Sequence, residues 1–225
     1  MPRGKRYQEE KKQVAGKTFS PAEAVTLLKK ISKVKFDPSV ELHIRLNVDP
    51  GQGSQMVRGT VVLPAGTGKE KRVAVFCTPA KEAEAKEAGA DIIGGEELVK
   101  EIKQKKKIEF DVAVAEPAMM KVISQIAPIL GPKGLMPNPK TETVTPNIGK
   151  AVKELKGGKV DFRMDNGANI HQVLGKLSFP ERDIVANIEA FTEAVKKAKP
   201  EKLKGELIKK IVLTSAMGPA VRLKL

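Results

Sequence analysis

The middle of the chain alternates apolar strands with helices, and this alternation limits the possible folds more than any other feature of the sequence. Residues 71–77 (KRVAVFC) form a strand-length segment with a continuous apolar run, which is typical of a strand buried on both faces of a sheet. A helix rich in Ala, Glu and Lys follows and ends at Gly89. This order of strand and helix recurs, which predicts a small parallel sheet with helices on its faces. The expected strands are 71–77, 91–93 and 108–115, and the expected helices are 79–89, 96–107, 116–130 and 147–155.

The two flanking pieces of the chain have a different pattern. Ser20, Pro21 and Glu23 have the order of a helix N-cap, a first-turn proline and a capping-box glutamate, so a helix is predicted to begin here. From residue 39 to residue 48 polar and apolar side chains alternate, which predicts a strand with one buried and one wet face. The other expected elements are a strand at 58–64, strands at 159–164 and 171–177 that form a hairpin around a turn at 165–167, a helix at 180–199, and strands at 208–215 and 221–223.

The basic charge is concentrated in the flanking pieces. The chain has 41 Lys and Arg against 27 Asp and Glu, which gives a formal net charge of +14. Residues 67–156 carry 16 basic and 13 acidic residues, whereas the rest of the chain carries 25 and 14. The shared charge and pattern predict that residues 1–66 and 157–225 form one discontinuous domain into which residues 67–156 are inserted. Gly66 and Gly157–Gly158 would mark the two points where the chain passes between these domains, and they would form a natural hinge.

Length and composition exclude several classes of protein. No apolar run in the 225 residues approaches the roughly 18–20 residues that span a bilayer, so no membrane partner is expected. The basic N-terminus has no apolar stretch after it and is therefore no secretory signal, and cytoplasmic residence is expected. The single cysteine, Cys77, excludes an internal disulfide. The only histidines, His43 and His171, form no ligand-spaced cluster with Cys77, so no metal site is predicted.

Motifs for catalysis and cofactor binding are also missing. The turn after the first inserted strand, Thr78-Pro79-Ala80, lacks the glycines that let a backbone approach a pyrophosphate. The loop at 131–140 contains Gly-Pro-Lys-Gly, but it is not the phosphate-binding loop of an NTPase. We therefore predict no enzyme, no catalytic residue and no cofactor. A nucleotide-using enzyme, based on the inserted segment, stays open as a minor alternative.

A net charge this far from zero indicates an anionic partner, and nucleic acid is the first candidate before an anionic membrane surface. Trp is absent, Tyr occurs once and Phe seven times, so a protein that stacks bases on aromatic platforms is poorly supported. Contact with phosphates and with the shape of a folded RNA fits better. A nonspecific basic nucleic-acid-binding protein is the alternative. Four lysines that lead into the strand at 208–215 are candidates for phosphate contact: Lys202, Lys204, Lys209 and Lys210.

The strand that begins at residue 39 offers the most informative polar face. Its alternation places Ser39, Glu41 and His43 on one face and apolar residues on the other. A carboxylate among cations is unexpected for simple attraction to phosphates, but it can accept hydrogen bonds from ribose 2′-hydroxyls or base amino groups. An ordinary exposed strand face explains the same pattern equally well. Met217–Gly218, after a later strand, reads either as a plain turn or as a close backbone approach that glycine permits.

Several motifs in a fixed order resemble a known family. The chain is similar to the bacterial form of the L-one family of large-subunit ribosomal proteins, from Lys5 to Leu223. The loop at 131–140 and Met217–Gly218 are together highly specific for it. The motifs are Lys35-Phe36-Asp37-x-Ser39-Val40-Glu41-Leu42, Val57-Arg58-Gly59-Thr60, Gly89-Ala90-Asp91, Gly94-Gly95-Glu96-Glu97, Leu130-Gly131-Pro132-Lys133-Gly134-Leu135-Met136-Pro137-Asn138-Pro139-Lys140, Gly175-Lys176-x-Ser178-Phe179 and Thr214-Ser215-x-Met217-Gly218-Pro219.

The resemblance implies a function and a fold. Members bind large-subunit rRNA, build the mobile stalk beside the tRNA exit site and help release deacylated tRNA, and bacterial members also repress translation of their own operon mRNA. A free monomer that becomes part of the large ribosomal subunit is expected. The implied fold combines α/β and α+β features in two domains: a discontinuous split βαβ (ferredoxin-like) sandwich and an inserted Rossmann-like three-layer α/β domain.

The resemblance also implies an RNA-binding site. One departure concerns Ala216, where the family commonly has Thr, so a hydroxyl hydrogen bond worth about 1 kcal/mol is missing there. The implied RNA-binding residues are Lys35, Phe36, Ser39, Glu41 and His43 on the first strand, Arg163, Asp165, His171, Lys176 and Ser178 around the expected hairpin, and Ser215, Met217 and Gly218 near the C-terminus.

Overall fold

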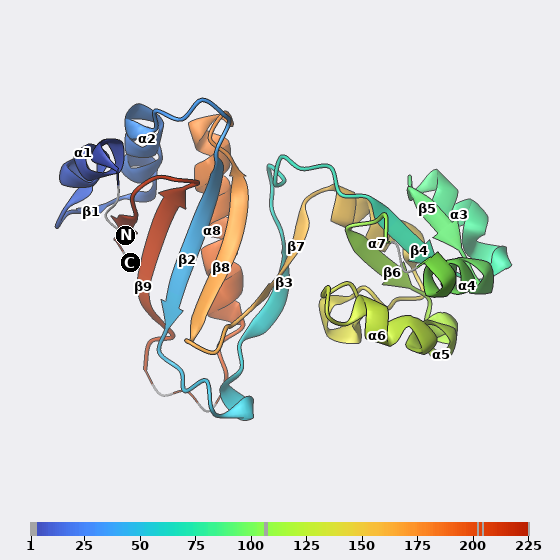
Figure 1. Cartoon of the computed structure of the whole chain (residues 1–225). Helices are drawn as coiled ribbons and strands as arrows, with labels where there is room; N and C mark the ends of the chain where they lie inside the picture. Colours follow the sequence, from blue (N-terminus) through green and yellow to red (C-terminus); the bar gives the residue numbers. More distant parts are fainter. Residues whose placement is uncertain (1–3, 106–107, 202, 204, 225) are drawn as a thin grey trace. The chain divides into compact units, whose positions relative to one another are not determined.

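The computed structural model of the chain describes residues 4–105, 108–201, 203 and 205–224. It has a mixed α/β architecture with several sheets (Figure 1). The chain divides into two compact units, one of residues 1–68 with 160–225 and the other of residues 69–159. Among the expected phosphate-contacting lysines, Lys202 and Lys204 lie outside the described residues. Over the described residues, no helix combines the length and the apolar character needed to cross a bilayer.

A five-stranded sheet forms the centre of the first unit. Its strand order is β1-β10-β9-β2-β8, so strands from both ends of the chain pair directly. β2 lies between β9 and β8 and is antiparallel to both. The strands are β1 (Thr18–Phe19), β2 (Ser39–Leu46), β8 (Asn169–Lys176), β9 (Ile208–Ser215) and β10 (Val221–Leu223).

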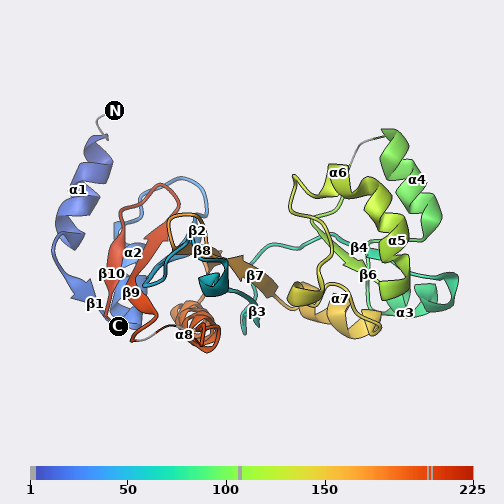
Figure 2. The same cartoon turned by 90° about the horizontal axis from the view of Figure 1, so that it is seen from below.

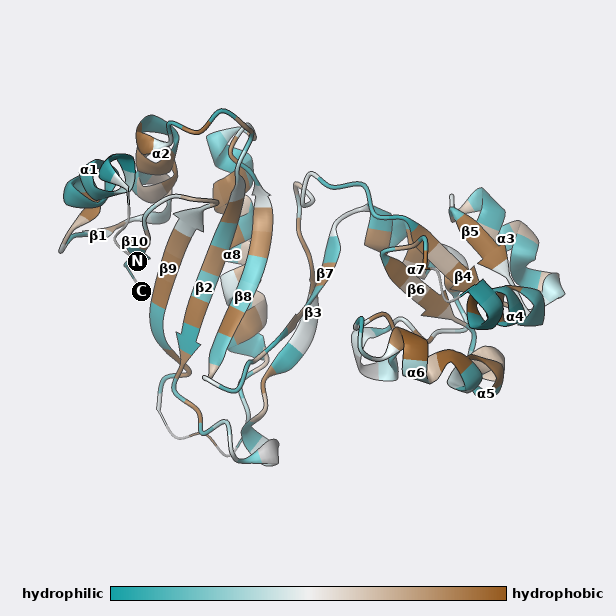
Figure 3. Cartoon of the chain, in the orientation of Figure 1, coloured by the Kyte–Doolittle hydropathy of each residue, from teal (hydrophilic) through white to brown (hydrophobic). Residues whose placement is uncertain are grey.

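Two helices, α2 (Pro21–Ile31) and α8 (Glu181–Lys197), pack with the apolar side chains of this sheet in one core. The predicted capping box of α2 is confirmed, because the Glu23 amide donates to Ser20 Oγ and the Ser20 amide donates to the Glu23 carboxylate. Figure 3 shows hydrophilic and hydrophobic residues alternating along β2, β8 and β9. The face opposite the core is called the open face here, and it carries Ser39, Glu41 and His43, as predicted.

The expected hairpin of residues 159–164 and 171–177 is wrong. β7 (Lys159–Arg163) pairs with β3 (Arg58–Val62) in a separate two-stranded sheet, whereas β8 pairs with β2. The buried ring of Phe162 packs edge-on against Phe191 of α8, with ring centroids 5.3 Å apart, so β7 has its own place in the core. The turn after β7 therefore connects two different sheets, because β7 pairs with β3 and β8 pairs with β2.

The second unit contains a three-stranded parallel sheet with the order β5-β4-β6. Alternate residues of β4 point to opposite sides: Phe76 joins the core under α4, α5 and α6, and Val75 joins the core under α3 and α7. Figure 2 shows these helices on the two sides of the strands. The elements are β4 (Val73–Phe76), α3 (Glu82–Glu87), β5 (Ile92–Gly94), α4 (Glu96–Lys105), β6 (Val112–Ala115), α5 (Met120–Ile123), α6 (Ala127–Leu130) and α7 (Ile148–Lys156).

Some elements differ from the expectation. The helix expected at 116–130 is broken into α5, α6 and short 3₁₀ turns, because Pro128 in its interior has no amide hydrogen to donate. The expected strand at 108–115 is shorter and starts at Val112. The helix α1 (Lys5–Val14) was not predicted, since its only buried residues are Glu10 and Val14. A short apolar stripe of this kind gives no periodic signal.

The loop at 131–140 ends the helix α6 and packs against the core of the second unit. The Leu135 amide donates to the Leu130 carbonyl, and Gly134 has φ +70°, which together form a helix-ending motif. The Leu135 side chain then packs against the core beneath α4 and α5. Further along, the Asn138 carbonyl accepts hydrogen bonds from the hydroxyls of Thr141 and Thr143. The motif therefore has a folding role in the second unit.

Candidate functional site

Three segments that are distant in the sequence meet at one end of the five-stranded sheet. β2 begins there, and β8 and β9 end there (Figure 1). The Ala216 amide donates to the Ser39 carbonyl at 2.9 Å, and the Leu177 amide donates to the Pro38 carbonyl at 2.9 Å. These bonds tie residues 35–39, 176–178 and 215–218 into a single edge, which is called the site edge here.

A hydrogen-bond network fixes the polar groups of the site edge. Lys176 is in register with Ser39, and its ammonium group donates to Ser39 Oγ at 3.2 Å and to the Asp37 carbonyl at 3.3 Å. The Asp37 carboxylate accepts from the Ser178 amide at 3.1 Å and from the Ser178 hydroxyl at 2.8 Å. Asp37 was not among the predicted site residues, although it stands within the quoted motif. It holds the predicted residues in place.

The turn at the end of β9 is strained and exposed. The Gly218 amide donates to the Ser215 carbonyl at 2.8 Å, which closes a four-residue turn. Met217 occupies the third position with φ +65°, a left-handed conformation that favours glycine and costs other residues roughly 1–2 kcal/mol. Its side chain is nevertheless 72% exposed, and Phe36, which is 53% exposed, lies on the same edge. Strain and exposed apolar surface together make this edge a candidate contact surface.

Tight packing beneath the turn explains the glycine. A Cβ atom at Gly218 would lie 2.3 Å from Ser215 Oγ and 3.2 Å from the Ser215 carbonyl oxygen. Ser215 is 2% exposed, and its hydroxyl has no hydrogen-bond partner among the described residues. The Arg6 guanidinium of α1 also donates to the Met217 carbonyl at 3.2 Å. Local packing against Ser215 thus accounts for the glycine at position 218, and a close approach of the Met217–Gly218 backbone to a ligand stays a prediction.

The two histidines meet on the open face. His43 and His171 are directly paired across β2 and β8, and their Nδ1 atoms lie 2.8 Å apart. The Glu41 carboxylate lies 3.8 Å from His43 Nε2, and the Asp165 carboxylate lies 3.4 Å from His171 Nε2. Burial and the neighbouring His171 lower the pKa of His43 below its usual 6.5, and Glu41 opposes them. His43 is therefore a neutral hydrogen-bonding group near pH 7.

This shifted pKa predicts a loss of stability on mild acidification. Because the pKa of His43 is lower in the folded than in the unfolded chain, the unfolded chain binds the extra proton as the pH falls below about 6.5. The folding stability is thus complete above this pH and decreases between pH 6.5 and the folded pKa. Chemical denaturation of the H43F variant at pH 7 and pH 5 should show a smaller difference than the parent protein. An equal difference in both proteins would contradict the assignment.

Asp165 and Arg163 lie away from the site edge. The Asp165 carboxylate accepts from the amides of Asn169 at 2.7 Å and Gly167 at 2.8 Å, and these bonds lower the pKa of Asp165. Its turn adjoins the far end of β2, since the Arg45 guanidinium donates to the Gly167 carbonyl. Arg163 is exposed on β7 in the two-stranded sheet. The structure thus brings together the residues of the site edge and the open face but not Arg163.

The sequence reasoning missed Arg45 and Asn169. Both lie on the open face, paired across β2 and β8, and Arg45 is also paired with Lys210 of β9. The alternation that placed Ser39, Glu41 and His43 on one face continues to Arg45, so the signal was available. No motif marked Asn169, and its place depends on strand register.

In the second unit, side chains contact one another at the position where a nucleotide-binding enzyme would hold its nucleotide. Ligands of parallel sheets bind beyond the carboxyl ends of the strands. There the Glu116 carboxylate, after β6, accepts from the amide of Thr78 at 3.2 Å and from its hydroxyl at 2.9 Å, and Lys81 is ion-paired with it at 3.1 Å. These contacts lower the pKa of Glu116. The Thr78 amide and hydroxyl and the Lys81 ammonium group, which could otherwise hold a phosphate, are therefore already paired with a carboxylate, and this does not favour the enzyme alternative.

The cysteine thiol and the possible metal-binding side chains form no reactive site in the part of the chain that the structure describes. Cys77 is buried, and burial raises the pKa of its thiol, so it is a structural residue. Across the described part of the chain, no three His, Cys, Asp or Glu residues are placed to hold a metal ion. The open face and the site edge thus remain the best candidate for a functional surface.

Comparison with known proteins decides the family. The Ribosomal protein L1p/L10e family matches residues 28–219. The chain belongs to this family. It is 49% identical to the large ribosomal subunit protein uL1 of Rubrobacter xylanophilus over 97% of this chain and 96% of that protein. It is also 50% identical to uL1 of Saccharopolyspora erythraea, over 97% and 92% of the two chains, and 54% identical to uL1 of Salinispora arenicola, over 91% and 86%. The match to the family includes the site edge, from Phe36 to Gly218, and the resemblance to bacterial L-one proteins seen in the sequence is confirmed.

Proposed function

We propose that the protein is a structural constituent of the large ribosomal subunit that binds large-subunit rRNA through the site edge and the open face. One observation carries this proposal: three distant segments converge on one rigid edge in a chain of net charge +14. The uL1 relatives, which are named as proteins of the large ribosomal subunit, support it. No catalytic role is proposed.

In this proposal the surface has two kinds of group. Lys35 and Lys176 contribute a sequence-independent attraction to phosphates that depends on salt. Glu41 and the Met217–Gly218 backbone contribute fit, because a carboxylate and a close backbone accept only one arrangement of ribose and base groups. The surface is held rigid before RNA arrives, since Asp37 and the sheet ladder already fix its polar atoms. Rigid surfaces lose less entropy on binding.

The finer parts of the proposal follow the family. The first compact unit would be the RNA-binding domain, a split βαβ sandwich, and the second unit an inserted Rossmann-like domain. In the cytoplasmic ribosome the protein would form the mobile stalk and assist release of deacylated tRNA from the exit site. The same surface would bind the mRNA of its own operon and repress its translation. When free, the protein would be a monomer.

The division of labour between charge and fit gives a differential prediction. We expect K176A to weaken binding to cognate and to scrambled RNA alike and to reduce the salt slope by up to about 0.7–0.9 for each lost phosphate contact. We expect E41A to weaken cognate binding by about ten- to a hundredfold, since a lost bond to a charged acceptor costs roughly 1.5–3 kcal/mol, and to leave scrambled RNA unaffected. Filter binding to an rRNA transcript at two salt concentrations measures both.

The same experiment tests the nonspecific alternative. A nonspecific basic protein would bind structured and scrambled RNA with equal affinity, and E41A would strengthen both by removing a negative charge. D183A is a suitable control for E41A, because it removes a half-buried carboxylate from the first turn of α8, on the other face of the sheet. Equal losses on the two RNAs with E41A would refute the proposed role of fit.

A further inference from the structure

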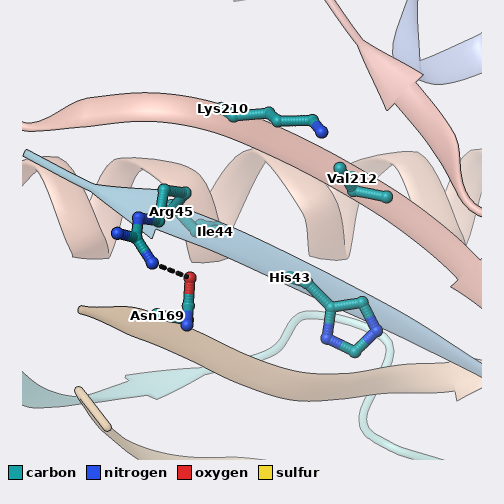
Figure 4. A pocket seen from close by; sticks show the side chains of 6 residues that line it. All are labelled: His43, Ile44, Arg45, Asn169, Lys210 and Val212. Carbon is teal, nitrogen blue, oxygen red and sulfur yellow. Dashed lines mark hydrogen bonds between the residues drawn. The ribbon is translucent and has the colours of Figure 1, made fainter. Parts of the chain in front are cut away.

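A pocket of about 260 Å³ opens on the open face, beside the histidine pair and away from the site edge. Figure 4 shows its walls, with His43 and Arg45 from β2, Asn169 from β8 and Lys210 from β9. Val212, which is paired with His43, also lines the pocket, and its side chain is shorter than those of Arg45 and Lys210. Of these residues, His43 is one of the RNA-binding residues implied by the resemblance, and Lys210 is one of the lysines expected to contact phosphate.

Two cations, Arg45 and Lys210, line this pocket, and no carboxylate of the residues that the structure describes lines it. Arg45 and Lys210 are directly paired in the antiparallel register of β2 and β9. Like charges at such a position destabilise a sheet, because their Cβ atoms lie only about 5 Å apart. Among the described residues, Lys210 has no hydrogen bond or ion pair. The pairing is unfavourable in the free protein and becomes favourable if an anion occupies the pocket.

The guanidinium of Arg45 is already oriented. It donates to the Gly167 carbonyl and, at 3.3 Å, to Asn169 Oδ1. Both acceptors are neutral, so the positive charge remains available to an anion. The Asp165 carboxylate in the adjoining turn is occupied by the amides of Gly167 and Asn169 and by His171. No carboxylate lines the pocket.

We propose that this pocket binds one backbone phosphate of the RNA, with Arg45 and Lys210 as its ligands. This inference rests on the RNA-binding function proposed above and extends the interface along β2 to its far end. A guanidinium that is fixed by neutral acceptors suits a phosphate, because its remaining N–H groups keep a planar fork. The neutral imidazole of His43 at the rim adds a hydrogen bond without adding charge.

The test measures how RNA binding depends on salt in the full-length protein. The probe is a transcript of the large-subunit rRNA of Rubrobacter xylanophilus, the source of one of the close relatives. We expect R45A and K210A each to lower affinity by about tenfold at low salt. Because both cations hold the same phosphate, the double variant should reduce the salt slope by about 0.7–0.9 in total, which corresponds to one phosphate. K210R should retain most of the parent slope.

The control removes an equivalent charge from the other side of the sheet. K196A changes an exposed lysine on α8, which packs against the opposite face, and it should leave the slope unchanged. The inference would be overturned if the double variant kept the parent salt slope, as K196A should. It would also be overturned if the salt slope fell by the amount expected for two phosphates. Failure of the parent protein to bind the transcript would instead refute the proposed function.

A free anion could supply the same chemistry as an RNA phosphate. RNA binding by the parent protein is therefore compared in roughly 10 mM inorganic phosphate and in chloride of the same ionic strength, so that screening of charges is equal in both. A saturable loss of RNA affinity in phosphate that K210A abolishes supports the inference, because the free phosphate and the RNA phosphate then compete for the pocket. Binding of inorganic phosphate, detected by calorimetry and abolished by K210A, that leaves the RNA affinity unchanged would show that the pocket is a site for free anions only, and the inference would be wrong.

Discussion

Replacing Gly218 with alanine should reduce affinity for cognate rRNA by about ten- to a hundredfold. The added Cβ would lie 2.3 Å from Ser215 Oγ, far inside contact distance, and Ser215 is enclosed, so its hydroxyl has little room to rotate. Overpacking of this kind costs roughly 1–3 kcal/mol, and each 1.4 kcal/mol is about tenfold in affinity. The turn must move, and with it the exposed Met217. Binding of scrambled RNA should change little, because no charge is lost.

A second substitution isolates the cause. S215A removes the clashing hydroxyl, which has no hydrogen-bond partner among the described residues, so this change alone should cost little stability. In the S215A background the nearest remaining atom to a Cβ at position 218 is the Ser215 carbonyl oxygen at 3.2 Å, which a small shift can accommodate. The double variant G218A/S215A should therefore bind rRNA about as well as S215A. If G218A were as damaging in both backgrounds, the clash would not be its mechanism.

The elements that a local pattern determines could be predicted from the sequence. The capping box of α2 and the alternation along β2 each depend on residues close in the chain, and both are confirmed. The parallel strands β4, β5 and β6 were also found, because runs of buried apolar residues between helices have few other interpretations. Their lengths were less accurate, since a strand ends where its partner ends.

Pairings between distant segments could not be predicted in this way. The hairpin of β7 and β8 seemed natural because a turn sequence stood between them, but the turn leads from one sheet to another. The 2.8 Å contact of His43 and His171 depends on the register of β2 with β8. A shift of one residue would place the two rings on opposite faces. Most residues of the candidate site were named from a resemblance to a family. The residue pattern by itself indicated the polar face of β2, the Met217–Gly218 turn and four lysines before and within β9.

The register of β8 depends on a buried asparagine, and its removal should be the most damaging change to stability. Val40 of β2 is paired with Gly175 of β8, whereas the next residue, Glu41, is paired with Val173. β8 therefore contains one extra residue at this point, Leu174, which forms a β-bulge. This bulge places Lys176 beside Ser39 at the site edge, and it leaves the Leu174 carbonyl without a partner on β2. Asn187 of α8 donates to that carbonyl at 2.7 Å.

Asn187 also fixes the chain where it leaves the first unit. Its amide group donates to the Gly66 carbonyl at 3.0 Å and accepts from the Ala65 amide at 3.1 Å, and the side chain is fully buried. N187A would leave three backbone groups unsatisfied, each worth roughly 1–3 kcal/mol, so we expect a loss of at least about 3 kcal/mol of unfolding free energy. Denaturant unfolding measures the loss, and hydrogen exchange of the Ala65 amide should accelerate in parallel.

A matched control on the same helix separates this role from a general effect on α8. Thr192 donates its hydroxyl to the Ile188 carbonyl within the helix, so T192V removes a hydrogen bond without freeing a bulge or a connection. We expect it to change stability by less than about 0.5 kcal/mol. Because the bulge determines where Lys176 lies, N187A should also lower cognate RNA affinity at temperatures where the protein remains folded, whereas T192V should not. Loss of stability without any change in RNA affinity would mean that the bulge keeps its register without Asn187, and that the site edge is positioned by the β-sheet ladder alone.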